Sequence, residues 1–433
     1  MTKLSSKFDV IVVGAGLAGS AAALEMARAG LDVCIIERAI VPGEKNVTGG
    51  VMFKGILDEF IPNWKNEAPI ERWITKKGIG MVTADSLSLM QYETERNEGY
   101  NACTLNRVHF DSWLADKAEE AGATLLTNTL VEDVILEDGF VKGVKTHHTD
   151  GYIYADIVIC ADGVNSLVAQ KAGLLKQDIS PKDIGLGIKE ILSLPEETIN
   201  ERFGLKGSEG CAYEFVGEFL NGVYGGAFIY TNRNTLSIGI VVNLGSIAET
   251  SVNSRAILEH FKNQPQIKKF IEGGSLVEYS AHLVPEVGLD MVPQLYGNGI
   301  LVTGDAAGLV INNGFSIQGM NYAIASGREA GKTAVNCIRQ GNVSAQKLAS
   351  YKHQLDQSFV GKNLKKFQKT HKVLANPRIG KEYPILIDNI AKNLFGFEDT
   401  IQPSLSSTLK NSLRGNVSPW KLIKDGIDIW RYM

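Results

Sequence analysis

The 433-residue chain has few cysteines, and their spacing excludes several kinds of site. No two of them form a C-x-x-C pair. Conventional iron–sulfur clusters need closely spaced thiolate ligands, so the chain by itself is not expected to hold one. Scattered cysteines also suit a reducing cytoplasm better than a disulfide-bonded secreted protein. The five are Cys34, Cys103, Cys160, Cys211 and Cys337.

Histidine is also scarce, and neither a long apolar run nor an excess of positive charge is present. The seven histidines include one adjacent pair, His147-His148, in an expected hairpin loop, and we predict no metal site. No stretch of about 20 apolar residues could span a bilayer, and the N-terminus lacks the apolar core of a signal peptide. A net charge of −4 argues against nucleic-acid binding. We therefore expect a cytoplasmic protein, soluble or attached to a membrane from outside.

The beginning of the chain carries the most informative pattern. Residues 8–13 predict a buried strand, residues 17–29 a helix and residues 32–36 a second strand. With 44% hydrophobic and 21% charged residues, the whole chain has ordinary globular composition, and its length favours more than one domain. A strand–helix–strand unit at this position predicts a dinucleotide-binding domain.

Three glycines and one acid complete this unit. Gly14 allows the tight turn after the strand, Gly16 lets the backbone approach a pyrophosphate, and Gly19 lets the helix pack closely. The helix N-terminus offers unpaired N–H groups to the phosphates. Glu37, 18 residues after Gly19, is placed to accept a hydrogen bond from a ribose 2′-hydroxyl. A carboxylate there repels a 2′-phosphate, so FAD or NAD fits better than NADP.

Two later segments return to the expected cofactor. Residues 300–303 predict a short strand, and Gly304-Asp305 follows at its carboxyl end, where open α/β sheets bind ligands. Asp305 there suits a ribityl hydroxyl, although a plain strand-end turn remains an alternative. Gly319-Met320-Asn321 opens a helix expected to run to Arg339, and its N-terminal amides suit the pyrimidine edge of a reduced flavin.

Two further segments are less specific. Asp162-Gly163 follows an apolar strand over 157–160, and an ordinary helix N-cap is the alternative role for the acid. Arg107 opens another expected helix, and a surface ion pair is its alternative role. The order of all these segments along the chain makes coincidence a poor explanation.

These motifs resemble the glutathione-reductase-type FAD proteins, which include aromatic hydroxylases and geranylgeranyl reductases. Within that group, the segments 42–50 and 277–286 resemble the electron-transfer-flavoprotein:quinone oxidoreductases (ETF-QO), specifically the FixC branch. In that family the Thr48-Gly49-Gly50 turn lies against the isoalloxazine ring, although a surface turn is the alternative here. The resemblance runs from about Phe8 to the C-terminus.

The resemblance implies FAD as the cofactor and a set of contact positions. It implies flavin-centred chemistry, so no catalytic residue is assigned beyond the weak candidate His282. The implied cofactor-binding residues are Gly14, Ala15, Gly16, Leu17, Ala18, Gly19, Glu37, Arg38, Thr48, Gly49, Gly50, Arg107, Val131, Asp162, Gly163, Gly304, Asp305, Gly319, Met320 and Asn321.

We therefore expect an α/β protein with a glutathione-reductase-type, Rossmann-like FAD domain, an inserted β-rich lobe and a C-terminal helical region. The FAD domain is assigned to 1–75, 100–178 and 284–343, and the quinone or substrate lobe to 76–99 and 179–283. In this lobe, residues 78–93 and the turn 232–234 predict hairpins, residues 252–271 predict one helix, and 276–284 predict a strand. His282 lies on the polar face of that strand, which is either a proton source or simply solvated.

The C-terminal region, 344–433, is expected to be helical and basic. Between positions 361 and 383 there are seven basic residues and a single acidic one. Trp420, Ile423, Ile427 and Trp430 recur at helical spacing. Such a stripe suits a membrane interface or a protein partner, and a helix facing the core is the alternative.

The resemblance implies an FAD-dependent oxidoreductase that relays electrons from an electron-transfer flavoprotein to a membrane quinone. A ferredoxin-like iron–sulfur subunit would supply the missing cluster, and the chain would contact the cytoplasmic face of the membrane peripherally. An FAD-dependent geranylgeranyl or other prenyl reductase is the alternative, because it shares the segment 304–308. A hydroxylase and a partner-binding protein without FAD fit the retained motifs less well.

Overall fold

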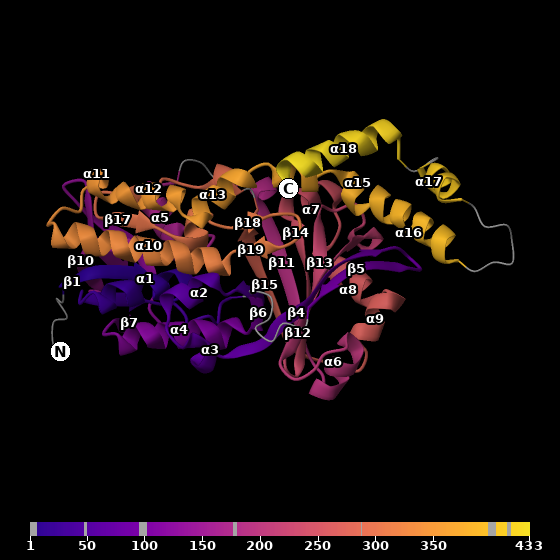
Figure 1. Ribbon diagram of the computed structural model, residues 1–433. Coiled ribbons are helices and arrows are strands. Elements are labelled where there is room, and N and C mark those ends of the chain that lie inside the picture. The colour runs from indigo at the N-terminus through magenta and orange to yellow at the C-terminus, as the bar shows by residue number, and fades with distance from the viewer. Residues whose placement is uncertain are drawn as a thin grey trace.

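The computed structural model describes residues 7–46, 50–94, 102–175, 180–286, 288–396, 404–413 and 417–433. Two large sheets lie side by side, and helices from the last third of the chain cover one side of both (Figure 1). The described part therefore has the α/β architecture that the sequence predicts.

The first sheet is built on the N-terminal strand–helix–strand unit. Its parallel core has the order β7-β2-β1-β10-β17, and β8, β9 and β16 extend it by antiparallel pairing. The central strands are buried apolar runs, as parallel strands covered on both faces require. The bounds are β1 Lys7–Val13, β2 Val33–Ile36, β7 Thr124–Leu126, β8 Val131–Glu137, β9 Phe140–Thr146, β10 Tyr152–Cys160, β16 Tyr296–Gly297 and β17 Ile300–Val302.

Three helices pack against this sheet and each other. α1 (Leu17–Arg28) follows β1, α4 (Arg107–Glu120) precedes β7, and α10 (Met320–Arg339) lies on α1. A Cβ at Gly327 of α10 would lie 2.0 Å from the carbonyl oxygen of Ala18, so glycine permits this close approach. The expected helices at 17–29 and 320–339 are therefore confirmed to within one residue.

The second sheet has nine strands and forms the other half of the molecule. Its order is β15-β11-β14-β13-β12-β4-β6-β3, and β5 pairs with β4. The bounds are β3 Gly50–Phe53, β4 Ile70–Val82, β5 Leu87–Glu93, β6 Ala102–Leu105, β11 Ile184–Ser193, β12 Glu209–Gly217, β13 Gly225–Thr231, β14 Thr235–Asn243 and β15 Ser275–Pro285. One face packs against α6 (Glu196–Phe203), α8 (Ser254–Asn263) and α9 (Pro265–Ile271) around a buried apolar cluster (Figure 1).

The single helix predicted over 252–271 is wrong. The structure has α8 and α9 there, with Gln264 between them in extended conformation. Pro265 lacks an N–H group and disfavours a helical residue before it, which explains the break. The hairpins at 78–93 and 232–234 are confirmed as the pairs β4–β5 and β13–β14.

The second sheet also extends beyond the segments assigned to the inserted lobe. β3, β6 and the start of β4 lie in segments that the sequence assigned to the FAD domain, yet they pair within the second sheet. The domain division drawn from the sequence therefore remains a proposal.

The last third of the chain is helical after α10. The helices are α11 Ala345–Leu348, α12 Ser350–Gln357, α13 Phe359–Lys366, α14 Thr370–Leu374, α15 Pro377–Gly380, α16 Glu382–Phe395, α17 Leu405–Leu413 and α18 Pro419–Tyr432. No helix in the described part of the chain is long and apolar enough to cross a membrane.

Candidate functional site

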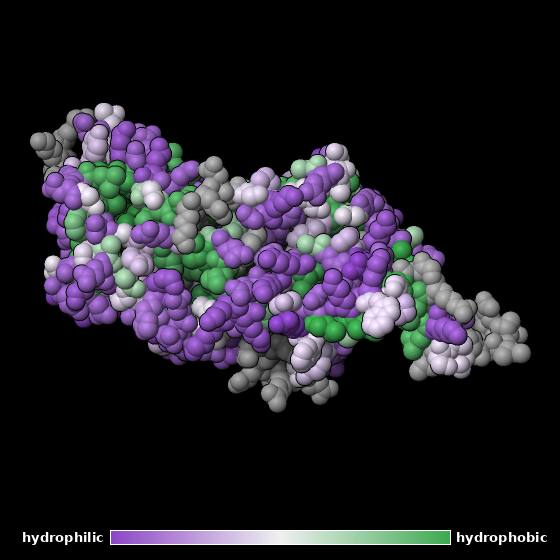
Figure 2. Space-filling model, turned by 90° about the horizontal axis from the view of Figure 1, so that it is seen from above, coloured by the Kyte–Doolittle hydropathy of each residue, from purple (hydrophilic) through white to green (hydrophobic). Residues whose placement is uncertain are grey.

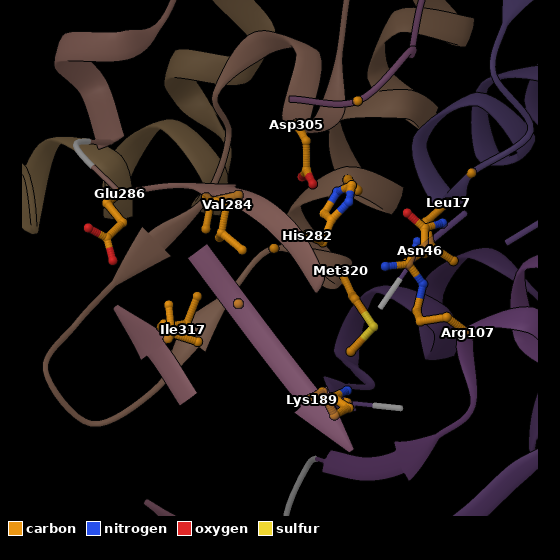
Figure 3. A pocket seen from close by; sticks show the side chains of 18 of the residues that line it. Leu17, Asn46, Arg107, Lys189, His282, Val284, Glu286, Asp305, Ile317 and Met320 are labelled. Atoms are coloured by element: carbon orange, nitrogen blue, oxygen red, sulfur yellow. The ribbon is translucent and has the colours of Figure 1, made fainter. Parts of the chain in front are cut away.

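A cavity of about 470 Å³ is lined by residues of both sheets and of the C-terminal helices. Figure 3 shows Asp305 and His282 beside each other, Met320 below His282, Lys189 further away beyond Met320, and Glu286 beyond Val284. The predicted cofactor residues that line it are Gly14, Gly16, Leu17, Ala18, Glu37, Arg38, Gly50, Arg107, Val131, Asp162, Gly163, Asp305, Gly319 and Met320.

The loop after β1 has the geometry expected for phosphate binding. Gly14 has a φ of +102°, and a Cβ there would lie 2.4 Å from the carbonyl oxygen of Ala161. A Cβ at Gly16, by contrast, would have no protein atom within 4 Å. Gly16 is also the N-cap of α1 and lacks a side-chain capping bond, so the first amides of the helix are available to a phosphate.

Glu37 braces this loop from the end of β2. Its Oε2 accepts a hydrogen bond from the Ala15 amide at 2.8 Å, and its Oε1 accepts one from the Ala39 amide at 2.8 Å. The carboxylate is buried at the cavity wall. Each carboxylate oxygen has a second lone pair, so the position remains compatible with the predicted ribose hydrogen bond.

Arg107 lies at the cavity wall as the first residue of α4. Its Nε and Nη2 bind both carboxylate oxygens of the buried Asp111, at 2.7 and 2.8 Å. Asn46 also donates to Asp111, at 3.0 Å. Arg107 thus makes an ion pair, and an ion pair at the surface was the alternative role that the sequence left open for it. Here, however, the arginine of the pair lines the cavity.

Asp305 and His282 meet in the centre of the lining (Figure 3). Asp305 is in η4 (Gly304–Ala307), directly after β17. Burial raises the pKa of its carboxyl, and the charge of Arg107 opposes the rise. Burial lowers the pKa of His282, and Asp305 opposes that change. His282 lines the cavity, and its lowered pKa favours the neutral imidazole, so its role as a proton source stays a prediction beside the alternative of a solvated strand face.

Two other predicted segments also reach the cavity. Gly319 is the N-cap of α10 without a side-chain capping bond, which leaves amides available beside Met320. Asp162 accepts a hydrogen bond from the Val168 amide at 2.9 Å near the start of α5 (Leu167–Lys171). Its Oδ1 is buried without a hydrogen-bond partner among the described residues. Asp162 thus makes a cap-like bond and also presents an unpaired oxygen.

Several predicted residues lie outside the cavity wall. Ala15, Gly19, Gly304 and Asn321 are in the surrounding structure and not in the lining. Gly19 is needed for packing, because a Cβ there would lie 1.9 Å from the carbonyl oxygen of Gly14. Thr48 and Gly49 lie outside the described residues.

The second sheet supplies the floor of the cavity. Paired residues in adjacent strands point to the same face, and the pairing places Lys189, Gly239, Phe228 and Glu214 in one row. The neighbouring positions Gly187 and Gly226 also line the cavity and carry no side chain. Val241 pairs with both glycines and also lines the cavity, so one side chain stands between two positions that have none. Leu374 of α14 and Ile379 of α15 also line the cavity.

Sequence reasoning missed the ionisable residues of this floor. Burial lowers the pKa of Lys189 to about 7, and burial raises the pKa values of Glu214 and Glu286 to about 7. The ammonium group of Lys189 lies 5.6 Å from the ring centre of Phe228. The available signal was a charge inside an otherwise apolar strand, as in the segments 184–193 and 209–217.

The lining fits a bound dinucleotide. Gly16 leaves open space at the N-terminus of α1, and a Cβ at Gly163 would also meet no protein atom within 4 Å. The unpaired Asp162 oxygen and the Glu37 carboxylate are acceptors for hydroxyl groups. Fold and lining thus define the chain as an FAD-dependent oxidoreductase, and residues 9–174 match the family model described as FAD dependent oxidoreductase.

The other two family models that match are more specific. Residues 184–284 match "ETF-QO, ubiquinone-binding", and residues 370–433 match the "ETF-QO/FixC family C-terminal domain". The chain is 42% identical to Protein FixC of Escherichia coli K12 over 97% of both chains. It is 40% identical to the probable electron transfer flavoprotein-quinone oxidoreductase YdiS of the same strain, over 97% of this chain and 98% of YdiS. The chain belongs to the ETF-QO family, in its FixC branch.

Protein FixC of Rhizobium meliloti is 40% identical to this chain, over 100% of both chains. Among solved structures, a geranylgeranyl bacteriochlorophyll reductase-like protein from Thermoplasma acidophilum has a TM-score of 0.73 at 22% identity, covering 98% of this chain and 99% of its own. The myxobacterial halogenase CndH has a TM-score of 0.62 at 16% identity, covering 99% and 91%. These two show the fold alone. The predictions of family, fold class, enzyme type and FAD are confirmed.

Proposed function

We propose that this FAD-dependent oxidoreductase relays electrons from an electron-transfer flavoprotein, through a ferredoxin-like iron–sulfur subunit, to a membrane quinone. One observation carries the proposal. A single cavity joins the glycine loop after β1 to the floor of the second sheet, in the segment that matches the ubiquinone-binding family model. A cofactor held by the loop and a ring held on the floor would lie in the same space.

The protein's contribution is to bind and orient, since bound FAD supplies the redox chemistry. The amides of α1 would hold the pyrophosphate, and the amides of α10 would face the flavin end. Gly187 and Gly226 would leave room on the floor for a quinone ring. The apolar side chains of Leu374 and Ile379 would contribute to keeping water out of the cavity.

A separate subunit would deliver the electrons. The five cysteines are all buried and separate, and among the described residues no group of His, Cys, Asp or Glu side chains could hold a metal. An iron–sulfur cluster in the relay would therefore come from a partner, as the FixC resemblance implies.

The C-terminal helix α18 is the proposed contact with the cytoplasmic face of the membrane. Trp420 and Trp430 are 80% and 86% exposed, and Ile423 and Ile427 are more than half exposed. The apolar stripe therefore does not face the core. Figure 2 views the side that carries α18, where apolar patches interrupt a largely hydrophilic surface. Tryptophan favours the headgroup boundary, and the lysines of 362–381 favour anionic headgroups.

The end of α18 also lies near the cavity. Gly314, in the loop between β18 (Ile311–Asn312) and β19 (Ile317–Gln318), lines the cavity, and a Cβ there would lie 1.8 Å from Cε of Met433. Docking through α18 would thus bring this side of the cavity close to the bilayer that holds the quinone.

The test uses the purified chain loaded with FAD and reduced without oxygen. Mixing with a soluble short-chain quinone should restore the flavin absorption at about 450 nm with formation of one quinol per flavin. A geranylgeranyl substrate, offered in parallel, should leave the reduced flavin unchanged. Reoxidation by the isoprenoid alkene, with no reaction toward quinone, would contradict the proposal and favour the prenyl reductase.

A further inference from the structure

Glu286 occupies an unusual position in the cavity lining. It follows directly after β15, and its backbone amide donates to the carbonyl of Asp183 at 2.9 Å. Its Oε2 accepts a hydrogen bond from Asn243 Nδ2 at 2.8 Å. Its Oε1 lies so close to β11 that a Cβ on Gly185 would be 2.6 Å away. The carboxyl group is thus held in one place by an amide on one side and a glycine on the other.

The charged side chain of Lys182 near Glu286 forms its ion pair with another residue. Lys182 lies in the adjoining η1 (Pro181–Asp183), where its carbonyl accepts from Asn243 and its ammonium group pairs with Glu249 at 2.8 Å. Tyr224, before β13, is a neighbouring phenol whose pKa is raised by burial and by the charge of Glu286. Among the described residues, no cation lies within ion-pair distance of this carboxyl, so its protonated form is not opposed by a fixed positive charge.

The other ionisable groups of the cavity differ in this respect. Glu214 has the ammonium group of Lys77 at 3.9 Å, which favours its ionised form. Burial lowers the pKa of His282, the charge of Asp305 opposes this change, and the charges of Arg107 and Arg38 add to it. Glu286 is therefore a carboxyl of the lining that can hold a transferable proton near neutral pH without a fixed positive charge beside it, a property that a general acid needs.

We propose that Glu286 is a catalytic acid that protonates one oxygen of the quinone. This assignment rests on the proposed function. Reduction of a quinone to a quinol consumes two electrons and two protons. Bound FAD, once fully reduced to its anion, would supply both electrons and one of the protons. The second proton comes from Glu286, whose O–H bond breaks as the quinol O–H bond forms. The carboxylate then takes a proton back from water.

The experiment compares two acceptors in single-turnover reoxidation of the FAD-loaded, reduced full-length chain. A short-chain quinone takes up protons, whereas ferricenium accepts one electron and takes up none. For Glu286→Gln, the quinone rate should fall roughly 10²-fold or more at pH 7, while the ferricenium rate stays unchanged. The wild-type quinone rate should decline above about pH 7, and the variant should lose this pH dependence. Glu249→Gln on the nearby α7 (Leu244–Thr250), where the side chain is exposed, is the matched control.

A second variant and a second measurement keep the test independent of turnover. Gly185→Ala retains the carboxyl but displaces it, so it should slow quinone reduction alone. The infrared carbonyl band of protonated carboxyl groups should lose its Glu286 component in Glu286→Gln, and in wild type this component should fade as the pH rises past about 7. This band does not depend on quinone turnover.

Three outcomes would overturn the assignment. A Glu286→Gln variant that keeps the wild-type quinone rate and pH profile would refute the acid role. If Glu286→Gln loses both acceptor rates equally, Glu286 acts in flavin binding or folding. If the pH dependence is lost in Glu214→Gln instead, Glu214 is the proton donor. A wild-type chain that reduces ferricenium but no quinone would instead refute the proposed function itself, and the acid role with it.

Discussion

At the scale of single residues, the cofactor loop depends on a few hydrogen bonds that reach across the first sheet. Glu37 stands at the end of β2, yet it accepts a bond from the Ala15 amide in the loop after β1. Asp305, which follows the strand β17 far along the chain, lines the same cavity. Both acids thus come from the ends of buried strands of the first sheet and line the cavity.

We expect Glu37→Ala and Asp305→Ala to weaken FAD binding by about 1–3 kcal/mol each. Glu37→Ala leaves the Ala15 and Ala39 amides unpaired, and Asp305→Ala would leave a ribityl hydroxyl of the bound cofactor unpaired. The measurement is the FAD dissociation constant, followed by flavin fluorescence during titration of the apoprotein. Glu132→Ala, in an exposed ion pair with Lys145, is the control. Wild-type affinity in both variants would remove these two acids from the binding site.

The Glu286 carboxyl also predicts a pH effect on stability. Its pKa is raised by burial from 4.5 to about 7, so the folded chain holds this proton where the unfolded chain has lost it. Its contribution to stability is present below about pH 4.5 and is lost as the pH rises toward 7. Glu286→Gln should therefore raise the Tm relative to wild type at pH 8 and have little effect at pH 4. Equal differences at both pH values would contradict the raised pKa.

At the scale of elements, α18 is fixed to the helices before it by one ion-pair cluster. Arg378 of α15 binds both oxygens of the buried Asp425, at 2.6 and 2.7 Å, and Tyr383 of α16 also bonds to this carboxylate. The bond to Arg378 lowers the pKa of Asp425 to about 2. Arg378 therefore acts inside the protein, although the sequence grouped it with the basic docking residues.

Asp425→Asn should loosen α18, since it removes a bidentate charged pair from a mostly buried site. We expect faster amide hydrogen exchange across 419–432 and little change in α1 or α10. Asp428→Asn, one turn further along the same helix, serves as the control. Unchanged exchange in Asp425→Asn would mean that other contacts hold the helix.

At the scale of the whole molecule, the exposed stripe of α18 predicts attachment to a surface. Trp420→Ser combined with Trp430→Ser should reduce co-sedimentation with anionic lipid vesicles roughly tenfold or more, because two large apolar side chains lose their burial in the interface. Salt should weaken the remaining binding. Tyr152→Ser, an exposed aromatic on the first sheet, is the control. Full vesicle binding by the double variant would favour a protein partner for this face.

The composition of the isolated chain supplies another prediction at this scale. Purified alone, the protein should contain about one FAD per chain and no stoichiometric iron, because its cysteines are separated and buried. Colorimetric iron and acid-labile sulfide assays check this. Stoichiometric iron and sulfide in the isolated chain would contradict the proposed iron–sulfur partner.

The sequence by itself determined the features that depend on neighbouring residues. The strand, glycine loop and helix over 7–28 and the helix over 320–339 follow from local spacing, and the FAD-binding family follows from the resemblance of these motifs to known FAD proteins. The prediction of one helix over 252–271 missed the break at Pro265, although a proline is a local signal for a helix boundary. Such features are local because backbone conformation and capping involve residues a few positions apart.

Only the tertiary structure decided which side chains share the cavity and which face of α18 is exposed. Lys189, Glu214 and Glu286 come together because β11 pairs with β14 and β15, and β12 pairs with β4 and β13, across long sequence separations. A helical stripe of apolar residues looks the same whether it packs on a core or faces outward. The contacts of Arg378 and Thr370 with α18 turn that stripe outward, and burial by distant strands, which no local pattern encodes, sets the pKa values in the cavity.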